Sequence, residues 1–269
     1  MWQVAKATIV RNQTDNLRAY PWSFTFGHII NGLYIVLVSY FAYTYLIKGE
    51  LDHRFAQFTG SNDYLTFAII GGVLSTLSVT MMMNVSRALI TEWREGTLEV
   101  ILLAPASRWG YFLGTAIQQL YRMMLVFIPV TLIGFWVGLR TPLADWLSVG
   151  IGIVLFFLSC FSMAMVLGAV MLYTRDTYIV QNTLFSILAL VCGFQFPVQY
   201  LPLPLQWLGE IFPLTSSLDM LRDSLLTGGL VWEQPERIVT NLILCVVYTL
   251  VGFFMNRQVE RTVFERHMA

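Results

Sequence analysis

No charged residue interrupts the stretch from Trp146 to Tyr173, which reads WLSVGIGIVLFFLSCFSMAMVLGAVMLY. Crossing the ~30 Å hydrocarbon core of a bilayer takes about 20 predominantly apolar residues in a helix. A helix suits this environment because it satisfies its own backbone hydrogen bonds where no water is present. The stretch therefore predicts a transmembrane helix.

Five further stretches of the chain are long and apolar enough to span a membrane. They run from Phe24 to Ile47, Tyr64 to Ile90, Tyr111 to Leu139, Tyr178 to Phe196 and Ile238 to Met255. The composition agrees, since 57% of the 269 residues are hydrophobic and 12% are charged, against roughly 25% charged residues in soluble domains. We predict an all-α integral membrane protein with six transmembrane helices, which form a single membrane domain over residues 1–269.

The positions of lysine and arginine predict the orientation, because basic loops tend to remain in the cytoplasm. With the N-terminus inside, ten of these residues fall in cytoplasmic segments and five outside, while Arg122 falls within the third span. Both termini are therefore predicted to be cytoplasmic. The segment 1–23 lacks the apolar core of a removable signal peptide. Its mixture of apolar and basic residues favours either an amphipathic helix on the membrane surface or a solvated tail.

The six predicted spans contain no aspartate or glutamate. Proton-coupled carriers and metal-dependent membrane enzymes need ionisable or ligand side chains at membrane depth, so this absence argues against both. A phosphate-binding loop, G-x-x-x-x-G-K-[ST], is also missing, since the only lysines are Lys6 and Lys48. The net charge of +0 gives no indication of nucleic acid as a partner. We therefore expect no catalytic residue, metal or cofactor on this chain, and active transport would need energy from a partner.

The segment between the second and third spans reads TEWREGTLEVILLAPAS over residues 91–107. It predicts a short amphipathic helix that ends near Pro105. Three acids at spacing i, i+3, i+7 would share one face, namely Glu92, Glu95 and Glu99. An apolar stripe would consist of Leu98, Ile101 and Leu102. Gly96 would allow close approach of another backbone. The acidic face either meets a cytoplasmic partner or is solvated.

The order EGTLE at 95–99 and LLAPAS at 102–107 resembles the signature of ABC type-2 transporter permeases. In that family the segment is a coupling helix, which docks in a groove of a separate ATPase subunit. The resemblance therefore implies an ATPase-coupling site made by Glu92, Glu95, Gly96, Leu98, Glu99, Ile101, Leu102 and Pro105.

A second stretch, residues 197–232, agrees with the same resemblance. The strings FPVQYLPLPL from residue 196 and FPLT from residue 212 resemble the re-entrant hairpin that precedes the last helix of these permeases. By themselves the prolines allow either a hairpin that dips into the outer leaflet or an external loop packed on the spans.

The resemblance implies a transporter built from two permeases, identical or related, and two ATPase subunits that bind ATP and Mg. In the plasma (inner) membrane it would export an amphiphilic or lipid-like substrate, such as a drug, a glycolipid or a lipid-linked polysaccharide. The chain itself would not be an enzyme. The alternative function is a stand-alone channel or an ion-coupled membrane carrier, which would need no ATPase.

Two arginines are candidates for the substrate pathway. Arg122 is the one charged residue well inside a predicted span, where a charge costs ~2.5 to 3.5 kcal/mol at the helix centre. It either contacts an anionic group of the substrate or a lipid, or reaches the cytoplasmic interface by snorkelling. Arg222 lies near Asp219 and Asp223 on the predicted hairpin. It either shapes the exit for the substrate or belongs to a solvated helix face.

Overall fold

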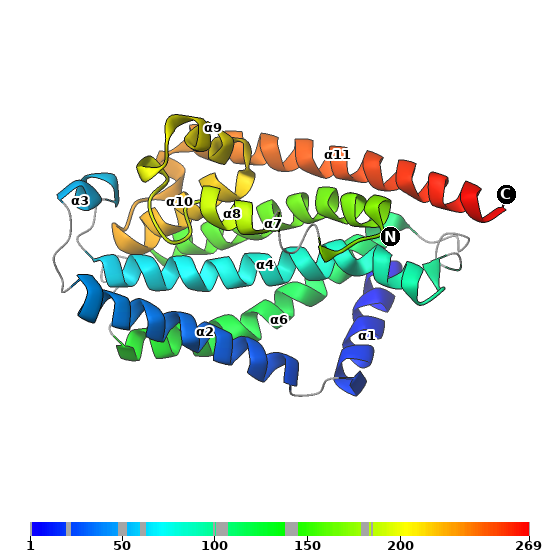
Figure 1. Ribbon diagram of the computed structural model, residues 1–269, viewed down its shortest axis with the longest axis horizontal. Coiled ribbons are helices and arrows are strands. Elements are labelled where there is room, and N and C mark those ends of the chain that lie inside the picture. The colour runs from blue at the N-terminus through cyan, green and yellow to red at the C-terminus, as the bar shows by residue number, and fades with distance from the viewer. Residues whose placement is uncertain are drawn as a thin grey trace.

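The computed structural model describes residues 2–19, 23–47, 53–59, 63–98, 100, 107–137, 145–178, 183 and 185–268. This part of the chain is built of helices and contains no β-strand, which confirms the all-α prediction (Figure 1). The long helices run side by side along the longest axis of the molecule. The shorter α1, Trp2–Ala19, lies across them at one end.

Four of the predicted spans correspond to long apolar helices. They are α4, Tyr64–Arg94; α6, Arg108–Val137; α7, Trp146–Thr174; and α11, Pro235–Met268. Among the described residues, these four helices are long and apolar enough to cross a membrane. The first predicted span forms α2, Ser23–Phe41, and continues as the π-helix η1, Ala42–Ile47. The apolar part of this segment, Ile29–Tyr45, is shorter than any of these four long helices.

The fifth predicted span does not continue as a helix to Phe196. Helix α8, Phe185–Val191, is followed by a turn in which Gly193 has a φ of +74°. Glycine adopts this left-handed conformation at little cost, so the chain leaves the helical path here. Residues 179–182 and 184, which belong to the start of this predicted span, lie outside the described residues.

The predicted hairpin contains two helices. These are α9, Leu203–Ile211, and α10, Pro213–Leu226, flanked by the 3-10 helices η3, Val198–Tyr200, and η4, Val231–Glu233. Pro204 and Pro213 lie in the first turns of α9 and α10, where a missing N–H is tolerated. Helix α10 packs against α7, α4 and α11. The prolines therefore start helices in this region.

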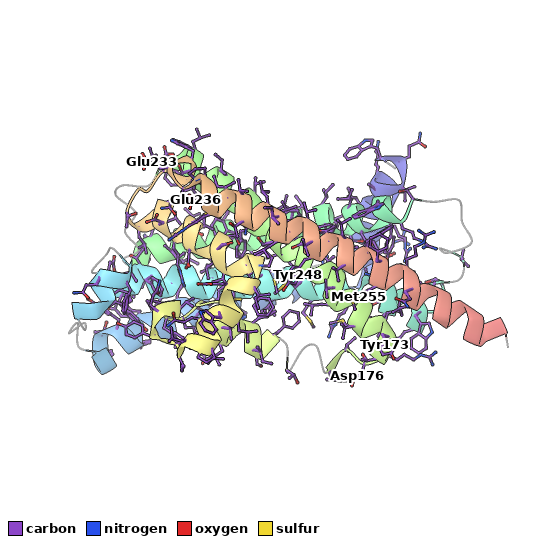
Figure 2. The ribbon with its side chains drawn as sticks, turned by 90° about the horizontal axis from the view of Figure 1, so that it is seen from above. Tyr173, Asp176, Glu233, Glu236, Tyr248 and Met255 are labelled. Carbon is purple, nitrogen blue, oxygen red and sulfur yellow. The ribbon has the colours of Figure 1, made fainter. Side chains whose placement is uncertain are left out.

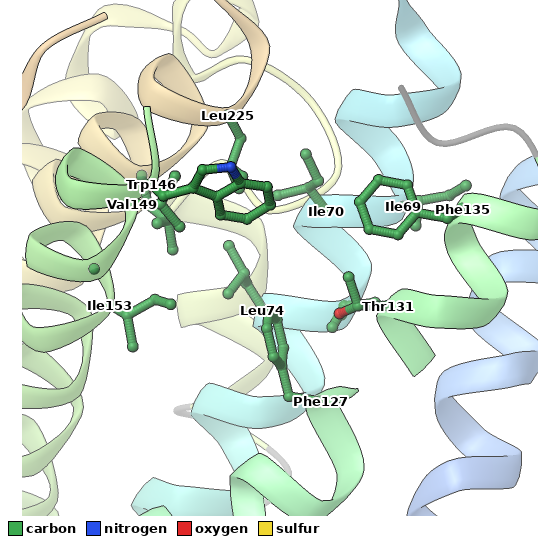
Figure 3. Close-up of a pocket in the computed structure, with 13 residues that line it drawn as sticks. Ile69, Ile70, Leu74, Phe127, Thr131, Phe135, Trp146, Val149, Ile153 and Leu225 are labelled. Atoms are coloured by element: carbon green, nitrogen blue, oxygen red, sulfur yellow. The ribbon is translucent and has the colours of Figure 1, made fainter. Parts of the chain in front are cut away.

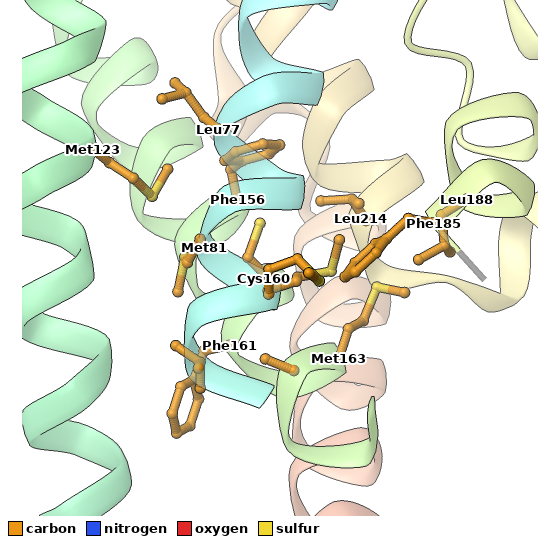
Figure 4. Close-up of a cluster of buried hydrophobic side chains, with 14 of the residues drawn as sticks. Leu77, Met81, Met123, Phe156, Cys160, Phe161, Met163, Phe185, Leu188 and Leu214 are labelled. Atoms are coloured by element: carbon orange, nitrogen blue, oxygen red, sulfur yellow. The ribbon is translucent and has the colours of Figure 1, made fainter. Parts of the chain in front are cut away.

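Helices α4 and α7 form the centre of the bundle, with most of their residues buried. Figure 4 shows the core, in which Met81 of α4, Cys160 of α7, Phe185 of α8 and Leu214 of α10 belong to one cluster of buried side chains. The three cysteines of the chain are all buried, and none forms a disulfide. Helices α6 and α11 expose apolar side chains along much of their length. Such exposed apolar surface suits a membrane environment.

The contact between α7 and α11 is very close. Figure 2 shows α11 running across the bundle from Glu236 past Tyr248 to Met255. At Gly252 of α11, an added Cβ would lie 2.6 Å from the carbonyl carbon of Met165. One turn later, the side chain of Asn256 donates a hydrogen bond of 2.8 Å to the Met165 carbonyl. Small residues permit such approach of helices in membranes, and polar side chains then bond across the interface.

We expect Gly252→Ala to destabilise the protein by about 1–3 kcal/mol, because α11 must shift away from α7. Gly150→Ala in α7 is the matched control, since no described atom lies within 4 Å of its added Cβ. Both changes add the same methyl group to a helix. The melting temperatures of the two purified variants in detergent measure the difference. Equal values would show that α7 and α11 are not packed this closely.

Candidate functional site

The helix ends that were predicted to face the cytoplasm come together at one end of the molecule. Helix α1, the C-terminal ends of α4 and α7, and the N-terminal end of α6 lie there, far from α3, His53–Thr59 (Figure 1). Arg175 follows the last turn of α7, and its guanidinium carbon lies 5.0 Å from the ring centroid of Trp93 on α4. This cation–π contact joins the two central helices next to the predicted coupling segment.

Helix α4 ends in a glycine turn. The N–H of Thr97 donates to the carbonyl of Glu92 at 2.9 Å, and the N–H of Gly96 donates to the carbonyl of Trp93 at 3.2 Å. This is a Schellman motif, which requires a left-handed residue after the helix, and Gly96 has a φ of +72°. Residues 91–94 therefore belong to α4, and the helix predicted over 91–107 does not begin at residue 91. Gly96 is needed to end α4.

Glu92 is buried at this helix end, with 3% of its surface exposed. Its carboxylate accepts hydrogen bonds from the guanidinium of Arg11, from the hydroxyl of Thr97 and, at 3.2 Å, from the hydroxyl of Tyr111. The three donors belong to α1, to the turn after α4 and to α6. A buried carboxylate is stable only with such partners. Glu92 therefore connects three segments of the chain.

The prediction that three acids share one exposed face is wrong for Glu92. The helix ends at Arg94, so the periodicity does not continue from Glu92 to Glu95. Glu95 and Gly96 are exposed, whereas Leu98 is buried. The other members of the predicted coupling site lie outside the described residues, and their roles stay predictions: Glu99, Ile101, Leu102 and Pro105.

Helix α1 supplies a partner that sequence reasoning missed. Ala5, Thr8 and Arg11 follow at intervals of three, so they share one face of the helix. Ala5 and Thr8 are buried, and an added Cβ on Gly114 of α6 would lie 2.6 Å from the Ala5 carbonyl oxygen. Burial alone would lower the pKa of Arg11, but the hydrogen bond and the charge of Glu92 raise it. The signal in the sequence was this face of small residues with one arginine.

Arg122 lies half-buried on α6, close to a group of buried amides. The side chain of Gln119 accepts a hydrogen bond from Asn84 of α4 at 3.0 Å and donates one to Gln118 at 2.7 Å. These amides join α6 to α4. Both roles considered for Arg122, substrate contact and snorkelling, stay predictions.

Arg222 lies towards the other end of the molecule, and with 4% of its surface exposed it is not on a solvated helix face. Its guanidinium donates to the carbonyls of Gly193, at 2.5 Å, and Phe194. The guanidinium carbon lies 3.9 Å from the ring centroid of Phe67 on α4. Gly71 leaves room for it, since an added Cβ there would lie 2.0 Å from a guanidinium nitrogen. Arg222 therefore fixes the turn after α8 to α10 and α4.

Residues 7–226 match the family model described as ABC-2 type transporter. The chain belongs to the ABC-2 type transporter family. It is also similar to two curated relatives, each named "Probable multidrug ABC transporter permease YbhR", from Escherichia coli strain K12 and from Escherichia coli O157:H7. Each is 24% identical over 184 residues, which make up 66% of this chain and 50% of the relative. The chain thus spans about half the length of the curated relatives it matches.

Family membership confirms the resemblance to ABC type-2 transporter permeases. Together with the apolar helices α4, α6, α7 and α11, it identifies the chain as a multi-pass permease of an ABC transporter. Permeases of this family are membrane components and are not themselves catalytic.

The permease has an apolar cavity of about 250 Å³ between α4, α6 and α7 (Figure 3). Phe127 and Phe135 of α6, Ile70 and Leu74 of α4, and Trp146 at the start of α7 line it. Its walls carry hardly any polar atoms. The cavity therefore suits an apolar group rather than an ion.

Glu92→Ala removes the acceptor that Arg11, Thr97 and Tyr111 share. We expect the melting temperature of the purified permease to fall by several degrees, because buried donors lose their partner. Glu95→Ala is the matched control, since this exposed acid lies on the same turn and should leave the melting temperature unchanged. A Glu92→Ala variant as stable as the control would disprove the three-segment contact.

Arg222→Ala leaves two backbone carbonyls without their donor. We expect a loss of about 1–3 kcal/mol in stability, which is the usual cost of unsatisfied buried polar groups. The turn at 193–196 should also become accessible, so chymotrypsin should cleave near Phe194 faster than in the wild type. Arg237→Ala, which removes an exposed arginine nearby, should change neither quantity. If both variants behave alike, the contact of Arg222 with the turn is unimportant.

Proposed function

We propose that this chain is the membrane-spanning subunit of an ATP-driven exporter, and that a separate ATPase docks on the segment that follows α4. The observation that carries the proposal is the contact made by Glu92. It fixes the turn that presents Glu95 and Gly96 to solvent. A partner can move the membrane helices only through a segment that is firmly attached to them.

The contacts of this turn provide a route for movement into the bundle. Tyr111 of α6 donates to the carboxylate of Glu92 and also lies 3.2 Å from the carbonyl of Ala88, one turn earlier on α4. Helices α4 and α6 are therefore linked next to the turn. Closure of ATP-bound ATPase subunits would move both helices together and open the pathway on the opposite side.

Each residue of the coupling site has a distinct role in this proposal. Glu95 makes the polar contact with the ATPase, while Glu92 holds the turn from inside and acts only through it. Gly96 ends α4, and the buried Leu98 anchors the segment. The part that enters the ATPase groove would then contain Glu99, Ile101, Leu102 and Pro105.

The proposed exporter contains two permeases, either two copies of this chain or this chain and a related one. Two ATPase subunits bind ATP and Mg, and the complex resides in the plasma (inner) membrane. Family membership supports this assembly. Arg122 is the candidate for contact with an anionic part of the substrate on the way through.

The proposed substrate is an amphiphilic or lipid-like molecule. The apolar cavity beside Phe127 supports a substrate with an apolar part. The relatives carry the name of a probable multidrug permease, which supports a drug-like cargo among the molecules of this class.

Glu95→Lys tests the docking site. We expect the variant to fold but no longer to copurify with the ATPase, since its charge is reversed at the contact. The rate of transport-linked ATP hydrolysis should fall at least tenfold. Glu233→Lys reverses an exposed acid of η4, which Figure 2 places towards the end of the molecule opposite Asp176, and should leave both quantities unchanged.

Normal ATPase binding by Glu95→Lys, alone and combined with Glu99→Lys, would overturn the docking assignment. An active chain that copurifies with no ATPase would instead favour the stand-alone channel or ion-coupled carrier.

A further inference from the structure

A polar cavity of about 480 Å³ lies between α9, α10 and α11. It is far from the turn at residues 95–97. Figure 2 places Glu236 of this cavity and Asp176 towards opposite ends of the molecule, and Arg175, next to Asp176, contacts Trp93 just before this turn. A second cavity of about 250 Å³ adjoins it, and Gln199, Asp219 and Arg237 line both. We refer to the two together as the joined cavity, and Asp219 lines both of its parts.

The joined cavity has an excess of acidic side chains. Its walls include four carboxylates and two guanidinium groups, which are Glu210, Asp219, Asp223, Glu236, Arg222 and Arg237. Two of these charges are already engaged by the protein. Arg222 donates to backbone carbonyls, and the carboxylate of Asp223 accepts from Thr227 at 2.7 Å and from Gln234 at 3.0 Å. The remaining groups are three acids and Arg237.

Of these three acids Asp219 is half-buried, whereas Glu210 and Glu236 are exposed. The carboxylate of Asp219 makes no hydrogen bond and no ion pair within 4 Å with any described residue. Burial raises the pKa of Asp219, although the charges of Arg222 and Arg237 oppose this shift. One turn earlier on α10, Thr215 is 5% exposed, and its hydroxyl oxygen has no hydrogen-bond partner among the described residues. Unused hydrogen-bonding capacity therefore lies beside an unpaired carboxylate.

The shape of the cavity adds an apolar part to the polar one. Along α11 it is lined by Glu236, Thr240 and Leu244, which follow at intervals of four and share one face. This face covers about 12 Å of helix and changes from acidic to apolar. Val198 lines the same cavity. A molecule with a charged head and an apolar tail fits this gradient.

We propose that the joined cavity binds the organic cation head of an amphiphile, with Asp219 as the counter-ion and Leu244 beside the tail. Carboxylates attract an ammonium group more strongly where little water is present to screen the charge. This inference rests on the proposed function for its significance in transport. It deepens that function by assigning a positively charged head to the amphiphilic substrate. The same chemistry is found in a cationic drug and in an ethanolamine lipid headgroup.

The binding test uses the purified full chain in dodecyl maltoside, an uncharged detergent, and tetraethylammonium chloride as the probe in calorimetry. We expect saturable binding, at least tenfold weaker in Asp219→Asn, and no binding of methylphosphonate. Glu233→Gln is the matched control because it removes an exposed acid near the cavity that does not line it. It should bind like the wild type.

A second variant keeps the test decisive if Asp219→Asn does not fold. Glu210→Gln changes an exposed acid that lines the cavity, and we expect binding two- to fivefold weaker. Wild-type affinity in every lining variant that folds, or an equal loss in Glu233→Gln, would overturn the proposal.

Competition by lipid identifies the source of the cation. Displacement of tetraethylammonium by phosphatidylethanolamine supports a lipid headgroup. Tetraethylammonium binding that persists in the presence of this lipid supports a soluble cation. Displacement by phosphatidylglycerol, which has no cationic head, would overturn the proposal. No ATPase is present in this assay, so its failure and the failure of ATPase docking are separate results.

Discussion

A carboxylate that is buried away from water must be given hydrogen-bond donors, and at the C-terminal end of α4 this requirement applies to Glu92. Its donors come from α1, from the turn after α4 and from α6. None of these segments can move far without leaving a buried charge unpaired. The exposed position of Glu95 is a result of this arrangement, because the turn that carries it is held by the hydrogen bonds of its buried neighbours.

The same requirement applies to a positive charge towards the other end of the molecule. The guanidinium of Arg222 uses the carbonyls of Gly193 and Phe194, and it rests on the ring of Phe67. Both buried charges therefore depend on α4, which lies beside Arg222 at Gly71 and contains Glu92 itself. The helix rises about 30 Å between these two positions. A single helix in the centre of the bundle thus connects the turn at residues 95–97 with the region of the polar cavity.

The long helices could be predicted because length and apolarity decide whether a segment can cross a bilayer. The predicted spans 64–90, 111–139 and 146–173 differ by only a few residues from α4, α6 and α7. Local exceptions could not be predicted in the same way. The turn at Gly193 cuts short a run that is apolar on both sides, and Gly96 ends α4 within a pattern that continues to resemble one helix face.

The partners of the buried charges were beyond sequence reasoning for a different reason. Glu92 and Arg11 are 81 positions apart. The small-residue face of α1 indicates that Arg11 lies at a contact, but it does not indicate which acid it meets. Arg222 is satisfied by backbone carbonyls, which every residue has and which therefore leave no side-chain signal. In contrast, the family signature could be identified from its order of residues alone, because it depends on residue types and not on their contacts.

The burial of Cys160, Cys192 and Cys245 makes the native protein a suitable background for site-specific labelling. Thiol reagents react with accessible thiolates, and none of these three side chains offers one to water. A cysteine introduced at an exposed position of the turn at residues 95–97 would be the only readily labelled thiol. Spectroscopic probes could then report distances across the working transporter without prior removal of core residues.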